Sequence, residues 1–64
     1  MDVREASAVG RLRRMAERSL AMAGVVRGEQ TRSMYLSMAT EYDALAQEFE
    51  VRAQMRAIRA AISA

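Results

Sequence analysis

The stretch from Thr31 to Phe49, TRSMYLSMATEYDALAQEF, decides the fold because it has the strongest periodic signal in the chain. Its larger apolar and aromatic residues return every three or four positions, which places them on one side of an α-helix. The members of this stripe are Thr31, Met34, Tyr35, Met38, Tyr42, Leu45, Ala46 and Phe49. The pattern predicts an amphipathic helix that packs its stripe against another helix.

That other helix is predicted on the N-terminal side of the stretch. Asp2 and Glu5 have the spacing of a capping box, in which each side chain accepts a hydrogen bond from the other residue's backbone amide. A wide stripe follows at three- and four-residue steps, formed by Val9, Leu12, Met15, Ala16, Ser19, Leu20, Met22, Ala23 and Val26. Together these signals predict a helix over about residues 3–26.

A turn must separate the two helices. Gly24 and Gly28 are the residues near the middle of the chain that most readily end a helix. We predict the turn at about residues 27–29 and a longer second helix over about residues 30–62. The predicted fold is therefore all-α, a single domain over residues 1–64 that forms an antiparallel two-helix hairpin.

The charges support this antiparallel arrangement. Arg11, Arg14 and Arg18 of the first helix fall roughly level with the acidic residues of the second when the chain folds back on the turn. Those acidic residues are Glu41, Asp43, Glu48 and Glu50. Exposed ion pairs stabilise a fold by only ~0–1 kcal/mol each, so we expect them to select the orientation more than to stabilise it.

The small size of the chain predicts association. A domain of 64 residues buries little of its unfolded surface, and this one has no cysteine for a disulfide and no histidine. With 52% hydrophobic residues and no other means of stabilisation, we expect the hairpin to be completed to a helical bundle by oligomerisation or by docking on a partner.

After Phe49 the apolar pattern changes phase. The same steps now lead to three arginines, Arg52, Arg56 and Arg59. The large apolar residues form a repeat of their own on another face, consisting of Val51, Met55, Ile58 and Ile62. Because the first helix ends opposite about residue 53, we predict that the last ten residues overhang and that this repeat is a partner interface.

Several arrangements of this C-terminal segment are compatible with the sequence. The helix can bend so that its isoleucines fold back on the same core. Two copies can each dock this face on the other, which gives a four-helix bundle or a swapped dimer. The segment can also insert into a groove on a different protein. Glu5 is expected to lie near Arg52 and to neutralise it.

No catalytic constellation is present in the sequence. Without His or Cys the serines lack a base, so we expect no enzymatic activity and no cofactor. Glu41, Glu48 and Glu50 are interpreted as solvated charges instead of metal ligands, because the Glu-x-x-His pairs of metal-binding bundles are missing. The tyrosines and methionines are assigned to the core, although tyrosines can stack on bases and methionines suit adaptable binding surfaces.

Part of the second helix resembles a bacterial protein family. Its residues Arg32, Met38-Ala39, Tyr42-Asp43, Leu45-Ala46 and Glu48 resemble the R…MA..YD.LA.E pattern of short, uncharacterised alphaproteobacterial helical-hairpin proteins. The likeness covers about residues 14–50 and departs at Arg27-Gly28-Glu29, where that family usually has an Asp-Pro helix start. The resemblance implies a bacterial cytoplasmic hairpin and no particular activity.

The function predicted from the sequence is that of a small, non-enzymatic interaction module. It would act as a homo-oligomeric bundle or as an accessory or regulatory subunit that docks on a larger protein through the C-terminal half of the second helix. The alternative is a small nucleic-acid-associated regulator that contacts phosphates through the three C-terminal arginines. No apolar run reaches the ~18 residues of a membrane span and no leader pattern is present, so we predict a cytoplasmic protein.

Overall fold

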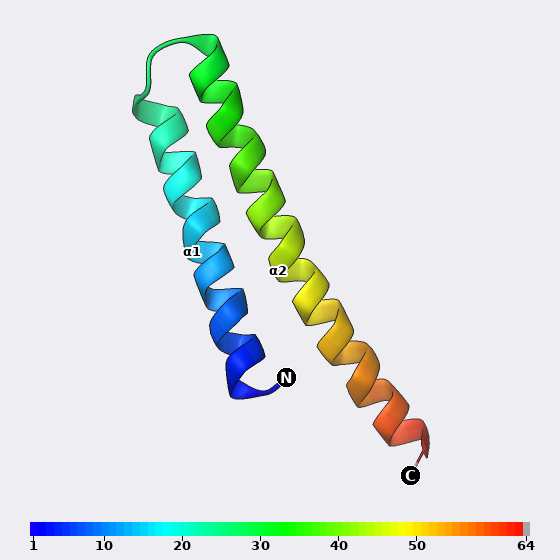
Figure 1. Ribbon diagram of the computed structural model, residues 1–64. Coiled ribbons are helices and arrows are strands. Elements are labelled where there is room, and N and C mark those ends of the chain that lie inside the picture. The colour runs from blue at the N-terminus through cyan, green and yellow to red at the C-terminus, as the bar shows by residue number, and fades with distance from the viewer. Residues whose placement is uncertain (64) are drawn as a thin grey trace.

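The computed structural model describes residues 1–63 and has two antiparallel helices, α1 (Val3–Val25) and α2 (Glu29–Ser63), joined by a short turn (Figure 1). The part of the chain that it describes contains no β-strand. The molecule is long and thin, with extents of 55 × 17 × 11 Å. The predicted all-α, antiparallel hairpin is confirmed.

The start of α1 is fixed by the predicted capping box. The Glu5 amide donates a hydrogen bond of 2.8 Å to Asp2 Oδ1, and the Asp2 amide donates one of 3.3 Å to Glu5 Oε1. These bonds satisfy backbone donors that have no partner inside the helix. The local sequence therefore determines where α1 begins.

The turn depends on one glycine in a left-handed conformation. Val26 leaves α1 in an extended conformation while its amide still donates to the Met22 carbonyl at 3.0 Å. Gly28 has a φ of 92°, which side-chain-bearing residues rarely adopt. Arg32, in the first turn of α2, donates from Nε to the Ala23 carbonyl at 3.4 Å. This hydrogen bond ties the first turn of α2 to the last turn of α1.

The contact between the helices is built on small residues, which we call the alanine seam. Its members, all 6% exposed or less, are Ala16, Ser19 and Ala23 on α1 and Ala39, Ala46 and Ala53 on α2. The three alanines of α2 are spaced seven residues apart, the repeat that keeps one side of a helix facing its partner. Small side chains at this repeat let the two helices approach closely, because interaxial distance depends on the residues at the contact.

Larger residues alternate with the seam on both helices. Tyr35, Tyr42 and Phe49 are half-buried and stand between the alanines of α2 at three- and four-residue steps. Val9 and Leu12 hold the equivalent half-buried positions on α1. The aromatic residues of α2 thus pack in the contact between the helices.

The predicted stripes were too wide. Five large residues assigned to the contact are instead between 38% and 51% exposed: Met15, Leu20, Met22, Met34 and Leu45. A helix presents only a narrow seam to a single partner, and a broader apolar sector stays uncovered unless further helices pack on it. The predicted stripe ended at Phe49, whereas buried Ala53 continues the contact by one more turn, to the level at which the first helix was predicted to end.

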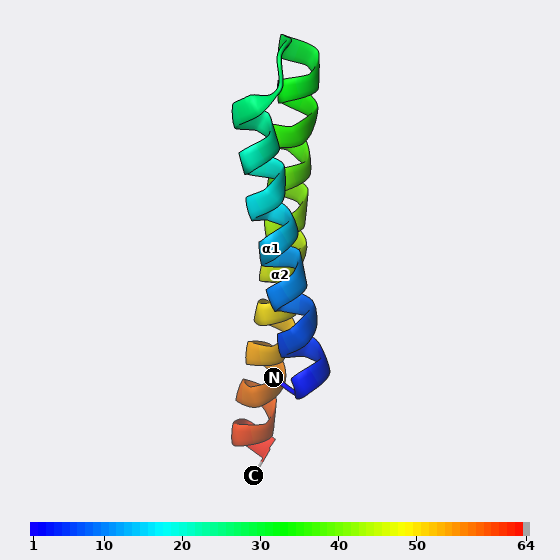
Figure 2. The ribbon, with the colours of Figure 1, turned by 90° about the vertical axis from the view of Figure 1, so that its left-hand side faces the viewer.

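The C-terminal part of α2 extends beyond α1 (Figures 1 and 2). The helix is unbroken to Ser63, and Ile58 and Ile62 are exposed. The alternative in which these isoleucines fold back on the hairpin core is therefore wrong. Glu5, near the start of α1, is paired with Arg56, so the overhang begins after this residue.

Candidate interaction surfaces

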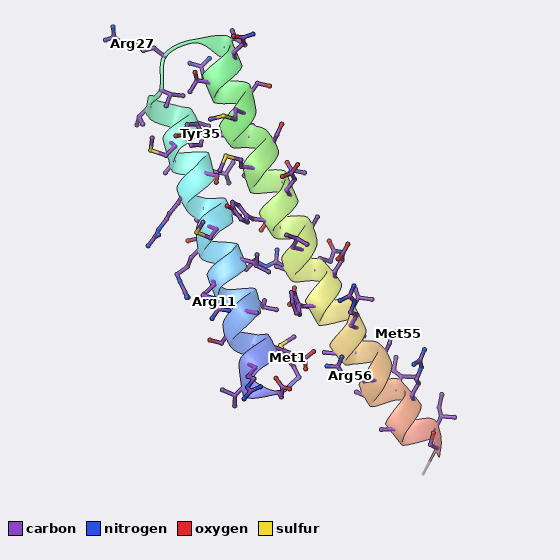
Figure 3. The ribbon with its side chains drawn as sticks, in the orientation of Figure 1. Met1, Arg11, Arg27, Tyr35, Met55 and Arg56 are labelled. Atoms are coloured by element: carbon purple, nitrogen blue, oxygen red, sulfur yellow. The ribbon has the colours of Figure 1, made fainter. Side chains whose placement is uncertain are left out.

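The four residues predicted as a partner interface form one face of α2, which we call the tail face. It consists of Val51, Met55, Ile58 and Ile62, which are between 44% and 79% exposed. On a helix with 3.6 residues per turn, these positions lie about 120–180° from the alanine seam. Figure 3 shows Met55 on the side of α2 away from α1 and Arg56 on the side toward it. The tail face therefore points away from the hairpin.

The three C-terminal arginines differ in their surroundings. Arg56 is paired with Glu5, and Arg52 lies 3.9 Å from Glu48 within α2. The predicted contact between Glu5 and Arg52 is thus wrong, because α1 reaches one turn further along α2 than the large apolar residues suggested. Arg59 has no carboxylate within 4.0 Å among residues 1–63.

The pairing with Arg56 makes Glu5 sensitive to pH. The hydrogen bond from the Arg56 guanidinium and, after it, that from the Asp2 amide hold the pKa of Glu5 below its ordinary value. A carboxyl group whose pKa is lower in the folded state stabilises the fold above its unfolded pKa. This contribution is lost as the pH falls through the folded pKa.

We therefore expect Glu5→Gln to be less stable than the unchanged protein near neutral pH and to lose less stability on acidification. The glutamine side chain has no charge to lose, whereas the other carboxyl groups are common to both proteins. Denaturant unfolding followed by circular dichroism at about pH 7 and about pH 3 measures both differences. An equal loss of stability on acidification in the two proteins would show that the Glu5–Arg56 pair does not contribute to stability.

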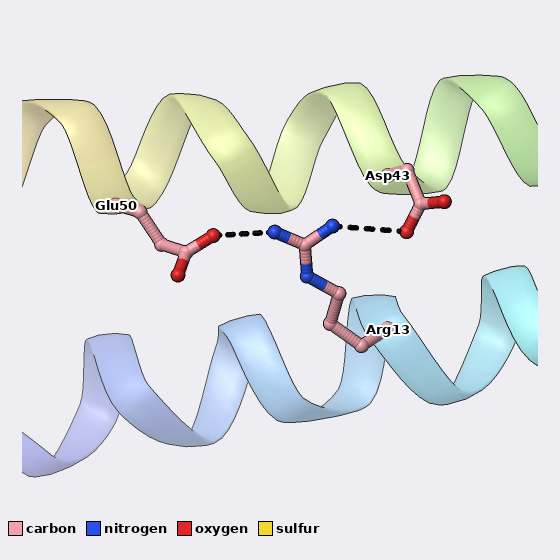
Figure 4. Close-up of polar contacts among 3 residues, drawn as sticks. All are labelled: Arg13, Asp43 and Glu50. Atoms are coloured by element: carbon pink, nitrogen blue, oxygen red, sulfur yellow. Dashed lines mark hydrogen bonds and ion pairs between the residues drawn. The ribbon is translucent and has the colours of Figure 1, made fainter.

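An arginine outside the set predicted to pair across the hairpin bridges the two helices. Arg13 donates to Asp43 Oδ1 at 3.1 Å and to Glu50 Oε1 at 2.5 Å (Figure 4). Asp43 and Glu50 are seven residues apart, so they flank the guanidinium from one side of α2, two turns apart. The bridge sets the register of the hairpin, with residue 13 level with the middle of residues 43–50.

The three arginines of α1 that were predicted to pair with acidic residues of α2 do not form these ion pairs. Arg11, Arg14 and Arg18 have no carboxylate within 4.0 Å among the described residues. They line a groove of about 610 Å³ together with Ala8, Leu12, Met15 and Phe49. The positions of these three arginines along the length of α2 were predicted nearly correctly. They lie, however, on the outer side of α1, away from the acidic side of α2. Only Arg13 projects along the flank next to the acidic side of α2.

The flank opposite the Arg13 bridge is apolar, and we call it the methionine face. Its members, placed by the groove and by helical spacing from it, are Leu12, Met15, Met22, Met34, Met38, Leu45 and Phe49. Met22 follows Met15 by seven residues, and Leu45 precedes Phe49 by four, so each pair shares one side of its helix. The face extends across both helices.

Metal and membrane signals are missing from residues 1–63. They contain no cluster of three or more acidic side chains arranged to hold a metal ion. Neither helix, over these residues, is long and apolar enough to cross a membrane.

No protein-family model, no curated protein and no solved structure matches the chain. The resemblance to alphaproteobacterial hairpin proteins therefore stays a prediction. A function has to be argued from the exposed surfaces of the hairpin.

Proposed function

We propose that the chain is a protein-interaction module without catalytic activity of its own, and that α2 docks its tail face in a groove of a larger protein. The observation that supports this proposal is the direction of the tail face. By helical spacing, its four exposed apolar side chains lie on the side of α2 away from α1, and Ile62 comes more than a turn after Arg56, which pairs with the start of α1. Folding of the hairpin alone cannot remove them from water.

The charges beside the tail face indicate the chemistry of the groove. Arg52 and Arg59 are seven residues apart and run along one edge of the tail face, whereas Ala57 and Ala60 lie on the other side of the helix. A complementary groove is apolar, with an acidic residue on the rim beside Arg59, the arginine of this edge that has no carboxylate within 4.0 Å among residues 1–63. Such a helix-in-groove contact is a common mode of protein recognition.

Docking on a protein has more support than contact with nucleic acid. Of the three arginines in the alternative, Arg56 and Arg52 already have carboxylate neighbours, and this leaves Arg59. Phosphate binding gains affinity from each cation that it neutralises, so a stripe with one arginine free of such neighbours is a weak anchor.

The proposal is tested by placing charges on the tail face and beside it. Ile58→Asp with Ile62→Asp puts two carboxylates into the docking contact, whereas Ala57→Asp with Ala60→Asp puts the same charges on the other side of the same turns. We expect capture of a partner from the native cell to be lost with the first pair and kept with the second. Bound partner should also slow amide hydrogen exchange over residues 51–62.

Both variant pairs must remain helical by circular dichroism for this comparison. Equal capture by the two pairs, or slowed exchange confined to residues outside 51–62, would contradict docking through the tail face.

A further inference from the structure

The methionine face is bordered by opposite charges on its two edges. Arg11 and Arg18, seven residues apart, run along the outer edge of α1 and line the groove of this face. Glu41 and Glu48, also seven apart, run along the outer edge of α2 beside Leu45. Arg52, which lies 3.9 Å from Glu48, follows them on the same edge beyond the level of Arg11. The face is thus an apolar band with a basic edge on one side and an acidic edge on the other.

These charges are spaced to match one another across the face. The Arg13 bridge places residue 13 level with the middle of residues 43–50. Counting along antiparallel helices from this level, Arg18 lies level with Glu41, and Arg11 lies level with Glu48. Within one chain these residues stand on opposite edges and form no ion pair with each other.

We infer that a second copy of this chain covers the methionine face, with the two-fold axis parallel to the helices. Rotation about this axis places the second hairpin face to face with the first and keeps each residue at the same position along the helix direction. Each α1 then lies antiparallel to the partner's α2. Arg18 meets the partner's Glu41, and Arg11 meets the partner's Glu48.

The charges select this arrangement over the other face-to-face dimer. A two-fold axis across the helices, in the plane of the face, stacks α1 on α1 and α2 on α2. It brings basic edge against basic edge and acidic edge against acidic edge, and such like charges repel. Both arrangements give a four-helix bundle in which every helix has two antiparallel neighbours, so the edge charges are what distinguishes them.

The size of the face agrees with a stable dimer. The part of the hairpin in which α1 lies beside α2 is about 35 Å long and 17 Å wide, which reaches the lower end of the roughly 600–1,000 Å² that each partner contributes to an ordinary stable interface. The large side chains that the hairpin leaves uncovered on this side become the core of the bundle. Methionine suits such a core because its flexible side chain fills irregular gaps.

The dimer leaves the tail faces open. The tail face is opposite α1 in its own hairpin, whereas the methionine face lies to the side. In the dimer both tails leave the bundle at the same end and point in opposite directions. The dimer does not depend on the proposed docking function, but it would present two docking helices to partners.

Edge charges provide a test that depends on this geometry. Arg11→Glu with Arg18→Glu makes both edges of a chain acidic, and Glu41→Arg with Glu48→Arg makes both edges basic. We expect the unchanged protein to be a dimer at micromolar concentration and low salt, and each variant alone to be monomeric. An equimolar mixture of the two variants should form a heterodimer, because acidic edges then meet basic edges at all four contacts.

Sedimentation gives the masses, and circular dichroism shows whether each variant alone is helical. A variant that unfolds by itself still tests the proposal, since mixing should restore both helicity and the dimer mass. Arg27→Glu with Arg59→Glu makes the same charge change outside the face and should stay dimeric.

The proposal is overturned if the unchanged protein is monomeric, if each variant alone remains a dimer, or if mixing restores nothing. It is also overturned if Ile58→Asp with Ile62→Asp dissociates the dimer, since the tail face would then join the copies. Loss of partner capture in that last variant, with the dimer intact, concerns the docking function alone.

Discussion

Ala46→Leu is expected to destabilise the hairpin by about 1–3 kcal/mol, the usual effect of forcing extra methylenes into a well-packed contact. Ala46 is 0% exposed and occupies the middle alanine of α2 in the seam. A leucine there has to push α1 away, and this would also separate Arg13 from Asp43 and Glu50. The added leucine would therefore weaken both the close packing of the helices and the ion pairs of Arg13.

Ala44→Leu is the matched control for this substitution. Ala44 lies two residues away on α2 and is exposed, so the same added carbons meet solvent. We expect its stability to stay within about 0.5 kcal/mol of the unchanged protein, as for most surface substitutions. The measurement is urea unfolding at one fixed chain concentration, because association makes apparent stability depend on concentration. Equal effects at both positions would contradict close packing at the seam.

Substitution by alanine at Gly28 and at Gly24 is expected to change the free energy of unfolding in opposite directions. At Gly28, with φ at 92°, an alanine is forced into a conformation that costs roughly 1–2 kcal/mol for residues with a Cβ. No heavy atom lies within 4 Å of the Cβ position there, so the cost is conformational and not a clash. Gly28→Ala should therefore lower the free energy of unfolding.

Gly24→Ala should raise the free energy of unfolding. Gly24 lies inside the last turn of α1, its Cβ position is also open, and alanine favours a helix over glycine by up to about 1 kcal/mol. Urea unfolding of the two single variants under identical conditions measures both effects. A loss of stability at both positions, or at neither, would contradict the assignment of Gly28 as the turn residue.

The fold could be predicted because its signals are local. The capping box, the glycines and the periodic apolar residues of the stretch Thr31–Phe49 each act over a few neighbouring positions. The side of each helix in contact was harder to predict. Large apolar residues indicate a broad apolar sector, whereas the seam runs through alanines spaced seven apart, a weaker signal than Met or Leu.

The sequence predicted which segments of the two helices lie side by side, but not which arginine forms the ion pairs between them. Arg13 and Arg14 are neighbours in sequence but point in directions about 100° apart, so a small rotation of α1 decides which one reaches α2. The phase shift after Phe49 was visible in the sequence, since it separates the large apolar residues of the tail from the arginines. Its direction relative to α1 became clear only from the burial of Ala53.

This hairpin has more apolar surface than its two helices can cover, and we therefore expect it to associate with itself. Sedimentation equilibrium of the unchanged protein at micromolar concentration tests this expectation most directly. We predict a mass twice the 7.1 kDa of one chain. A folded, helical protein with the mass of a single chain across this concentration range would contradict self-association.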